Sequence, residues 1–210
     1  MVRIKICGIT NLEDALLAAE LGADALGFIF YPKSPRKVAP ETAREIIAQL
    51  PPFVASVGVF VDEAAAVVQE LAARVGLDWV QLHGQESPEY CRNLGRRVIK
   101  GFRIQDAESL RPLADYREAA QALLLDSYKQ GQVGGTGTAF DWRLAREAKP
   151  YGRIILAGGL TPENVAQAIA AARPQAVDAA SGTEAAPGRK DPAKLRAFFR
   201  AVAHAPLAHP

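Results

Sequence analysis

Cysteine and histidine are scarce in this chain. It contains two cysteines, Cys7 and Cys91, and three histidines among 210 residues. Two cysteines are too few for a disulfide framework or for a cysteine-based metal site, and two of the histidines lie in the C-terminal tail. We therefore expect neither a bound metal nor a cofactor.

The chain also lacks long apolar segments and long runs of one charge. No apolar run approaches the ~18 residues that a membrane-spanning helix needs, and no signal-peptide pattern precedes the first strand. The 25 basic and 23 acidic residues are interspersed, which argues against nucleic acid as the main partner. We expect a cytoplasmic protein that binds neither membrane nor nucleic acid, while a small anionic ligand stays open.

Short apolar runs alternate with alanine-rich amphipathic stretches along the chain. This alternation is typical of β–α units around a parallel sheet. Eight strands are predicted, at residues 3–7, 25–30, 55–60, 79–82, 98–102, 122–126, 154–157 and 176–179. Eight units fit a closed barrel better than an open doubly wound sheet, and no GxGxxG sequence follows the first strand.

We predict a single-domain α/β protein, a (β/α)8 barrel over residues 1–203. Its last helix is expected at residues 192–202. Residues 204–210 are rich in Ala and Pro, have no amphipathic face and are expected to fray. In this architecture the loops after the strands build the active site, so unusual residues at the carboxyl ends of strands are the functional candidates.

Two predicted strands end in groups that can accept or donate a proton. Cys7 closes the first strand and Asp126 closes the sixth. A lone cysteine is often an inert core residue, and a carboxylate in this position often caps a turn. His83 follows the fourth strand and is equally compatible with a structural or a functional role, whereas Cys91 lies in a helical pattern and is expected only to pack.

Glycine-rich sequences follow the last three strands. They are Gly134-Gly135-Thr136-Gly137, Gly158-Gly159 and Ser181-Gly182. Glycine lets backbone amides approach a ligand closely, although a single glycine cluster is equally typical of a flexible connection. Barrels frequently bind phosphate in the loops after strands seven and eight, so we expect a phosphorylated ligand there.

The loop after strand two is basic and stiffened by proline, with the sequence Tyr31-Pro32-Lys33-Ser34-Pro35-Arg36-Lys37. A guanidinium offers two parallel donors that match a carboxylate. Arg36 is therefore a candidate for binding a carboxylate, and a solvated basic loop is the alternative.

Together these motifs resemble the phosphoribosylanthranilate isomerase family, over almost the whole chain up to Val202. The likeness is carried by Lys5-Ile6-Cys7-Gly8-Ile9-Thr10, Gln81-Leu82-His83-Gly84, Leu125-Asp126-Ser127, Gly134-Gly135-Thr136-Gly137 with Phe140-Asp141-Trp142, Ala157-Gly158-Gly159-Leu160 and Ser181-Gly182-Thr183-Glu184. The first motif and the loop-six motif are specific to that family, whereas the last two are shared by many phosphate-binding barrels.

The resemblance implies an enzyme of tryptophan biosynthesis that converts N-(5-phosphoribosyl)anthranilate to 1-(2-carboxyphenylamino)-1-deoxyribulose 5-phosphate by an Amadori rearrangement. It implies Cys7 as general base and Asp126 as general acid. Substrate binding is expected from Arg36, His83, Gly135, Gly158, Gly159, Ser181 and Gly182. Ala180 departs from the family, which more usually has Ser there, and this affects one side-chain contact to phosphate rather than the backbone amides.

Two alternatives stay open at this stage. The first is another phosphosugar isomerase or epimerase on the same barrel, since fold alone does not fix chemistry. Such epimerases resemble metal-dependent sites with several His and Asp, and only one His lies at a strand end here. The second is a non-catalytic phosphometabolite-binding subunit, against which the pair Cys7 and Asp126 counts. The oligomeric state is not determined, and a homodimer is compatible with the sequence.

Overall fold

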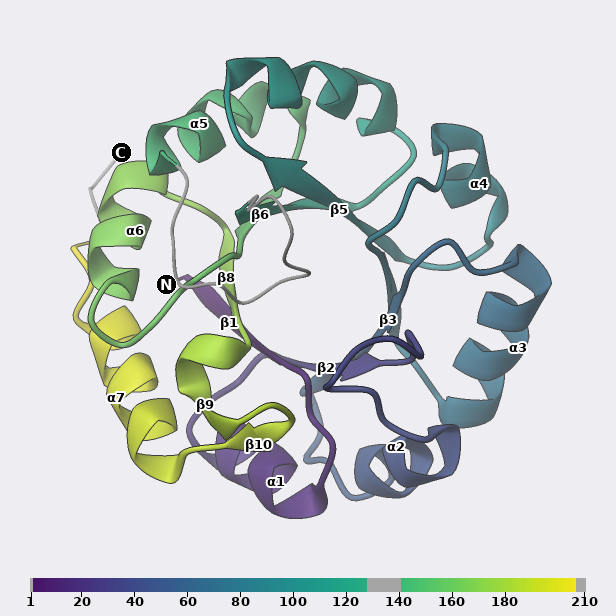
Figure 1. Cartoon of the computed structure of the whole chain (residues 1–210), viewed down its shortest axis with the longest axis vertical. Coiled ribbons are helices and arrows are strands. Elements are labelled where there is room, and N and C mark those ends of the chain that lie inside the picture. The colour runs from purple at the N-terminus through teal and green to yellow at the C-terminus, as the bar shows by residue number, and fades with distance from the viewer. Residues whose placement is uncertain (1, 128–140, 207–210) are drawn as a thin grey trace.

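Eight parallel strands form a closed barrel in the computed structural model, which describes residues 2–127 and 141–206. The strands follow one another around the ring in chain order, and β8 closes it by pairing with β1. Figure 1 looks down the barrel and shows the helices surrounding it. The barrel strands are β1 (Arg3–Cys7), β2 (Ala25–Ile29), β3 (Ala55–Phe60), β4 (Trp79–Leu82), β5 (Val98–Ile104), β6 (Ala122–Ser127), β7 (Ile154–Leu156) and β8 (Ala176–Ala179). The predicted (β/α)8 fold is confirmed.

Several helices of the outer ring begin at the residue types expected for helix starts. The Asn11 side chain caps the first helix by accepting a hydrogen bond from the Asp14 amide at 2.9 Å. Pro40 and Pro192 occupy first helical positions, where the missing N–H is not needed. The helices are α1 (Leu12–Glu20), α2 (Pro40–Ile47), α3 (Ala65–Val75), α4 (Pro88–Asn93), α5 (Trp142–Glu147), α6 (Val165–Ala172) and α7 (Pro192–Ala203).

Two features differ from the regular alternation that the sequence predicts. Between β5 and β6 the chain forms a 3-10 helix, Ala107–Tyr116, with Pro112 inside it. Proline lacks the N–H that a regular helix interior needs, so a longer α-helix is disfavoured there. After β8 the chain adds a 3-10 turn, Ser181–Thr183, and a short antiparallel hairpin of β9 (Glu184–Ala186) and β10 (Arg189–Lys190).

Most of the core lies between the barrel and the helices. It is built from Leu, Ile, Val, Ala and Phe side chains, and fully buried Phe28 and Phe198 are its largest members. A smaller cluster of Val57, Ile99, Leu124, Ile155 and Ala157 fills part of the barrel interior. Charged and polar side chains share that interior, since Lys5 and Gln81 are 3% and 2% exposed.

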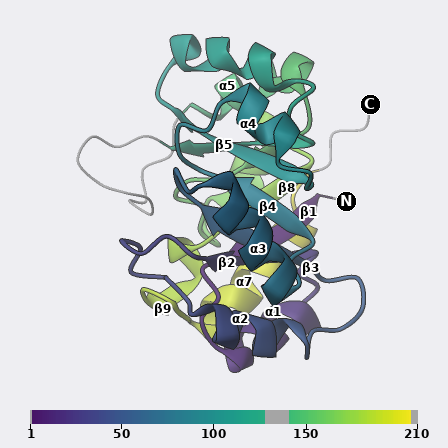
Figure 2. The ribbon, with the colours of Figure 1, turned by 90° about the vertical axis from the view of Figure 1, so that its right-hand side faces the viewer.

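The side view separates the two ends of the barrel (Figure 2). The N-terminus and the start of β1 lie on the right, and β9 lies on the left, where the strands end. Within residues 2–127 and 141–206, no helix is long and apolar enough to cross a membrane. Ala205, just after α7, is buried against the core, and the expected fraying of residues 204–210 stays a prediction because residues 207–210 lie outside the described part.

Candidate active site

Cys7 and Asp126 lie at the same end of the barrel. Cys7 is the last residue of β1, and Asp126 is the next to last of β6. Because all eight strands are parallel, both residues are at the carboxyl ends, where the loops of such barrels build active sites. Strands β7 and β8 separate β6 from β1 along the shorter arc of the ring. The two groups are therefore placed on different walls of one opening.

Cys7 is buried and lies among charged groups. Lys190 Nζ donates a hydrogen bond to the Cys7 carbonyl oxygen at 2.7 Å. Burial raises the pKa of the Cys7 thiol above its ordinary value, while the positive charge of Lys5 opposes that rise and Asp178 adds to it. The thiolate form thus depends on the nearby cations.

Asp126 faces a histidine. His83 Nε2 lies 3.5 Å from Asp126 Oδ2, and both side chains are less than a fifth exposed. On its other side His83 Nδ1 is 3.1 Å from Gln81 Nε2. Gly101 makes room for the ring, because a Cβ there would lie 2.8 Å from Nδ1. The structure therefore brings His83 to Asp126, and its expected role in substrate binding stays a prediction.

Arg36 reaches the same end of the barrel and packs over the residue after Cys7. Gly8 has a φ of +79°, a conformation that side chains rarely adopt. A Cβ on it would also lie 2.8 Å from the Arg36 Cδ atom, so both the backbone and the close packing favour glycine. Arg36 also forms a bidentate ion pair with Glu184, with three N–O distances between 2.8 and 3.0 Å. Burial alone would raise the pKa of Glu184, but the hydrogen bonds from Arg36 and the charge of Lys190 hold it below its ordinary value.

The two loops expected to bind phosphate touch each other. Gly158 and Gly159 follow β7 and have φ angles of +85° and +63°, which side chains would disfavour. Gly182 follows β8, and a Cβ on it would lie 1.9 Å from the Leu160 carbonyl oxygen. Ser181 and Gly182 start the 3-10 turn beside it. The two loops are therefore in direct contact, whereas Gly135 falls outside the described residues.

Four charged residues around this end were not expected from the sequence as functional candidates. They are Lys5, Asp178, Glu184 and Lys190, all buried. Lys5 and Asp178 carried a readable signal, since each is a charge inside a short apolar strand, RIKIC and AVDA. Glu184 lies in the motif Ser181-Gly182-Thr183-Glu184 but was given no role of its own, and Lys190 carried no signal, because the hairpin that brings both inward was not predicted.

The described residues offer no obvious place for a metal. Within residues 2–127 and 141–206, no group of three or more His, Cys, Asp and Glu side chains is arranged to hold an ion. The charged groups at this end are instead satisfied by each other, as Lys190 and Glu184 are at 3.4 Å.

The fold and this site are those expected of a (β/α)8-barrel isomerase, with a thiol, a carboxylate and glycine-rich loops at the carboxyl end of the strands. The chain belongs to the phosphoribosylanthranilate isomerase family, because the family's sequence model, described as N-(5'-phosphoribosyl)anthranilate (PRA) isomerase, matches residues 4–201. It is 58% identical to the N-(5'-phosphoribosyl)anthranilate isomerase of Geobacter metallireducens over 200 residues, which cover 95% of this chain and 98% of the relative.

Solved structures agree with this assignment. The phosphoribosylanthranilate isomerase of Thermotoga maritima superposes with a TM-score of 0.91 at 47% identity, covering 97% of this chain and 99% of the other. A family structure in complex with reduced 1-(o-carboxyphenylamino)-1-deoxyribulose 5-phosphate gives a TM-score of 0.87 at 45% identity, with the same coverage. A Thermotoga maritima structure of monomers generated from a dimeric isomerase gives 0.87 at 43%, again with the same coverage.

Proposed function

We propose that this chain converts N-(5-phosphoribosyl)anthranilate to 1-(2-carboxyphenylamino)-1-deoxyribulose 5-phosphate, in tryptophan biosynthesis, with Asp126 as general acid and Cys7 as general base. The observation that carries these roles is the placement of the two groups at the ends of β6 and β1, on different walls of the barrel mouth. A relative's complex with a reduced form of the product supports the choice of substrate.

Asp126 serves the first step. Opening the furanose requires a proton on the ring oxygen while the anilino nitrogen forms an iminium, and a carboxylic acid can donate that proton. His83 Nε2, 3.5 Å from Oδ2, borders the acid on one side. It therefore limits the directions in which the carboxyl group can face the sugar.

Cys7 serves the second step. The iminium acidifies the neighbouring C2 hydrogen of the sugar, and a base must remove it to give the enol amine that becomes the ketose. Cys7 lies at the end of β1, and the strands β7 and β8 separate it from Asp126 on β6. Each group needs to contribute only ~10²- to 10⁴-fold, because anchoring of the substrate supplies much of the remaining acceleration.

The substrate has an anion at each end, and the site has a matching group for each. We assign the phosphate to the amides of the loops after β7 and β8, which meet at Gly182 and Leu160. We assign the anthranilate carboxylate to Arg36, whose Nε and Nη2 face Glu184. Its Nη1 group is not among the donors that bind Glu184.

The direct test is turnover. Enzymatically generated phosphoribosylanthranilate should be consumed by the purified chain, followed as loss of anthranilate fluorescence. A ribulose 5-phosphate epimerase assay serves as the comparison, and activity there without activity on phosphoribosylanthranilate would establish the alternative reaction. Binding of both compounds without turnover would favour the non-catalytic alternative.

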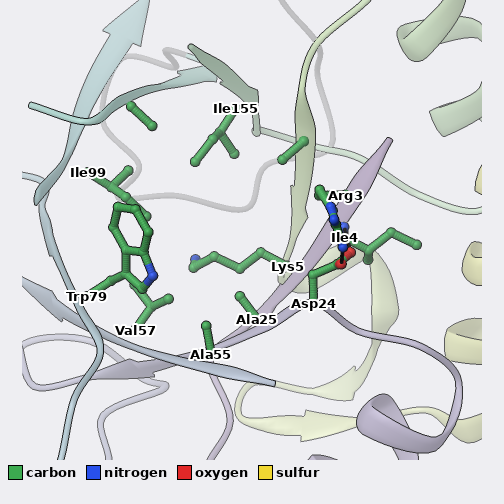
Figure 3. A pocket seen from close by; sticks show the side chains of 12 residues that line it. Arg3, Ile4, Lys5, Asp24, Ala25, Ala55, Val57, Trp79, Ile99 and Ile155 are labelled. Carbon is green, nitrogen blue, oxygen red and sulfur yellow. Dashed lines mark hydrogen bonds and ion pairs between the residues drawn. The ribbon is translucent and has the colours of Figure 1, made fainter. Parts of the chain in front are cut away.

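We further propose that the chain forms a homodimer through the amino-terminal end of its barrel. Phe53, two residues before β3, is fully exposed and has a φ of +73°, a conformation that costs a bulky residue roughly 1–2 kcal/mol. The same end holds an apolar cavity of about 190 Å³ (Figure 3). Most of its exposed lining is apolar and includes Ala25, Ala55, Val57, Trp79, Ile99 and Ile155, and the charged residues Arg3, Lys5 and Asp24 also border it.

A phenyl ring from a second copy fits this cavity. Protein cavities of ~150 Å³ bind benzene, and an isologous contact would place two such rings in two cavities at once. Several lining residues, Trp79 among them, are half-buried, so the cavity reaches the surface. A relative described as dimeric supports the same oligomeric state.

We also propose a cytoplasmic location. Cys7 and Cys91 are both free and buried, and catalysis by the Cys7 thiolate requires a reduced sulfur. Reducing compartments such as the cytoplasm maintain thiols in that state.

A further inference from the structure

Lys5 and Asp178 form a charged pair inside the barrel. They are register partners on the neighbouring strands β1 and β8. Lys5 Nζ donates to the two carboxylate oxygens at 3.0 and 2.9 Å, and the two side chains are 4% and 8% exposed. Figure 3 shows the Lys5 side chain extending into the barrel interior.

Stability alone is a weak explanation for such a pair. Removing two charges from water costs several kcal/mol per ion, and apolar side chains of similar volume often serve equally well or better. The position of the pair in the barrel is therefore a better guide to its role than its contribution to stability.

That location is beside Cys7. Lys5 and Cys7 are two residues apart on β1, so their side chains project to the same side of the sheet. Gly27 is the register partner of Cys7 on β2. A Cβ on Gly27 would lie 2.7 Å from Cys7 Sγ and 3.1 Å from Lys5 Nζ. The sulfur and the ammonium thus border the same small space, which the missing side chain of Gly27 leaves open.

We propose that Lys5 is a positioning residue for the Cys7 thiolate: its ammonium group, oriented by Asp178, donates a hydrogen bond to Sγ and stabilises the negative charge there. The inference rests on the proposed role of Cys7 as general base. The thiol proton leaves to solvent before the substrate binds. The sulfur lone pair then takes the C2 proton, the C–H electrons move into the iminium, and Lys5 keeps its proton throughout.

The charges that face Cys7 come from three elements. Lys5 lies on β1, Asp178 on β8 and Lys190 on β10, while β2 contributes only Gly27. Burial of the Lys5 amine would by itself lower its pKa, but Asp178 and the Cys7 sulfur together raise it above the ordinary value. Burial lowers the pKa of Lys190 despite Glu184. Lys5 is therefore the cation that stays charged most securely beside the sulfur.

The test measures the ionisation of Cys7 in the full-length enzyme. Alkylation of Cys7 by iodoacetamide is followed by peptide mass spectrometry between pH 6 and pH 10, together with the acidic limb of kcat/KM. A neighbouring cation typically shifts a pKa by one unit or more, so Lys5→Met should slow alkylation at pH 7.5 about tenfold and move the acidic limb to higher pH. Lys5→Arg should restore part of the loss, because it keeps the positive charge.

Asp178→Asn distinguishes an effect of charge on Cys7 from an effect of altered packing. It removes the negative charge that raises the pKa of Cys7 and keeps an oxygen that can accept from Lys5. The acidic limb should therefore move to lower pH, opposite to Lys5→Met. The double variant Lys5→Met/Asp178→Asn, which leaves no unpaired buried charge, should again show slower alkylation, since Lys5 acts on the sulfur more strongly than Asp178 does.

Lys100 provides the matched control. It pairs with Glu86 at 3.0 Å, and those side chains are 3% and 2% exposed. Lys100→Met should leave the Cys7 alkylation profile unchanged. An unchanged profile in Lys5→Met and in the double variant would overturn the proposal, as would shifts of Lys5→Met and Asp178→Asn in the same direction. Near-normal kcat in Cys7→Ala would instead overturn the role of Cys7, whatever the alkylation data show.

Discussion

Arg36 and Glu184 are joined by a bidentate ion pair that links the loop after β2 to the first residue of β9. The pair is nearly buried, with side chains 13% and 4% exposed. The guanidinium is thus oriented before any substrate arrives, which reduces the ordering that binding requires.

Arg36→Met should therefore raise KM for phosphoribosylanthranilate about 10- to 100-fold, the effect of losing one charged hydrogen-bonding partner. Glu184→Gln should raise KM less, because the guanidinium stays present but less firmly held. Steady-state kinetics measure both, with Arg111→Met as the control, since the Arg111 side chain is 77% exposed and its ion pair is with the exposed Glu108. An unchanged KM in Arg36→Met would show that Arg36 and the loop after β2 do not bind the substrate.

Cys7→Ala and Asp126→Asn should each reduce kcat by ~10²-fold or more. Both should still bind a reduced, non-isomerisable product analogue at near wild-type affinity, because the phosphate and carboxylate contacts survive. Titration calorimetry and circular dichroism check binding and folding. Near-normal kcat in either folded variant would return that residue to a structural role.

Deuterium at C2 of the substrate separates the two steps. The Asp126→Asn variant should be limited by ring opening and show little isotope effect on kcat. Wild-type enzyme should show a larger effect under conditions in which proton removal limits the rate. A large effect in Asp126→Asn would contradict its assignment to ring opening.

Crystals soaked with sulfate or phosphate should show the anion between the loops after β7 and β8. The amides near Gly158, Gly159 and Gly182 are the expected donors, because these glycines let the backbone approach a ligand closely. Density found only at other places would contradict this phosphate site.

Phe53→Glu should convert the protein to monomers, because it removes the phenyl ring and a carboxylate would lose its hydration in a cavity with a mostly apolar lining. Sedimentation velocity at several concentrations measures the change. Val67→Glu on α3 is the matched control, since Val67 is also an exposed apolar residue. A wild-type chain that sediments as a monomer at all concentrations would remove the dimer proposal.

Exhaustive chelation should leave full turnover of phosphoribosylanthranilate, because proton transfer through Cys7 and Asp126 completes the reaction. Activity that returns only on addition of a divalent ion would instead favour a metal-dependent epimerase mechanism.

The barrel was predictable because its periodicity is local. All eight strands appear where the apolar runs lie, with ends within two residues of those expected. The 3-10 helix that contains Pro112 and the hairpin after β8 were not predicted, for different reasons. The proline converts an expected helix into a 3-10 helix, and the strands β9 and β10 are too short to show alternation.

The individual site candidates were predictable because strand ends converge in a parallel barrel. The ion pairs that surround these candidates could not be predicted. Lys5 meets Asp178 across 173 residues of chain, and Arg36 meets Glu184 across 148. The first pairing depends on closure of the barrel between β8 and β1, and the second depends on the position of the β9–β10 hairpin. Neither can be predicted from a local sequence pattern. The sequence predicted that Arg36 binds a carboxylate of the substrate, and the structure shows that it also binds the internal carboxylate of Glu184.

The bond from Lys190 Nζ to the Cys7 carbonyl spans 183 residues of sequence. During synthesis this bond can form only after residue 190 has left the ribosome, whereas the pairing of Cys7 with Gly27 of β2 needs only the first part of the chain. Long sequence separations of this kind slow folding, because loop closure precedes any gain from the contact. Chains truncated before Lys190 should therefore keep most of the barrel's residues yet lack this contact, and the positive charge that it brings, beside Cys7.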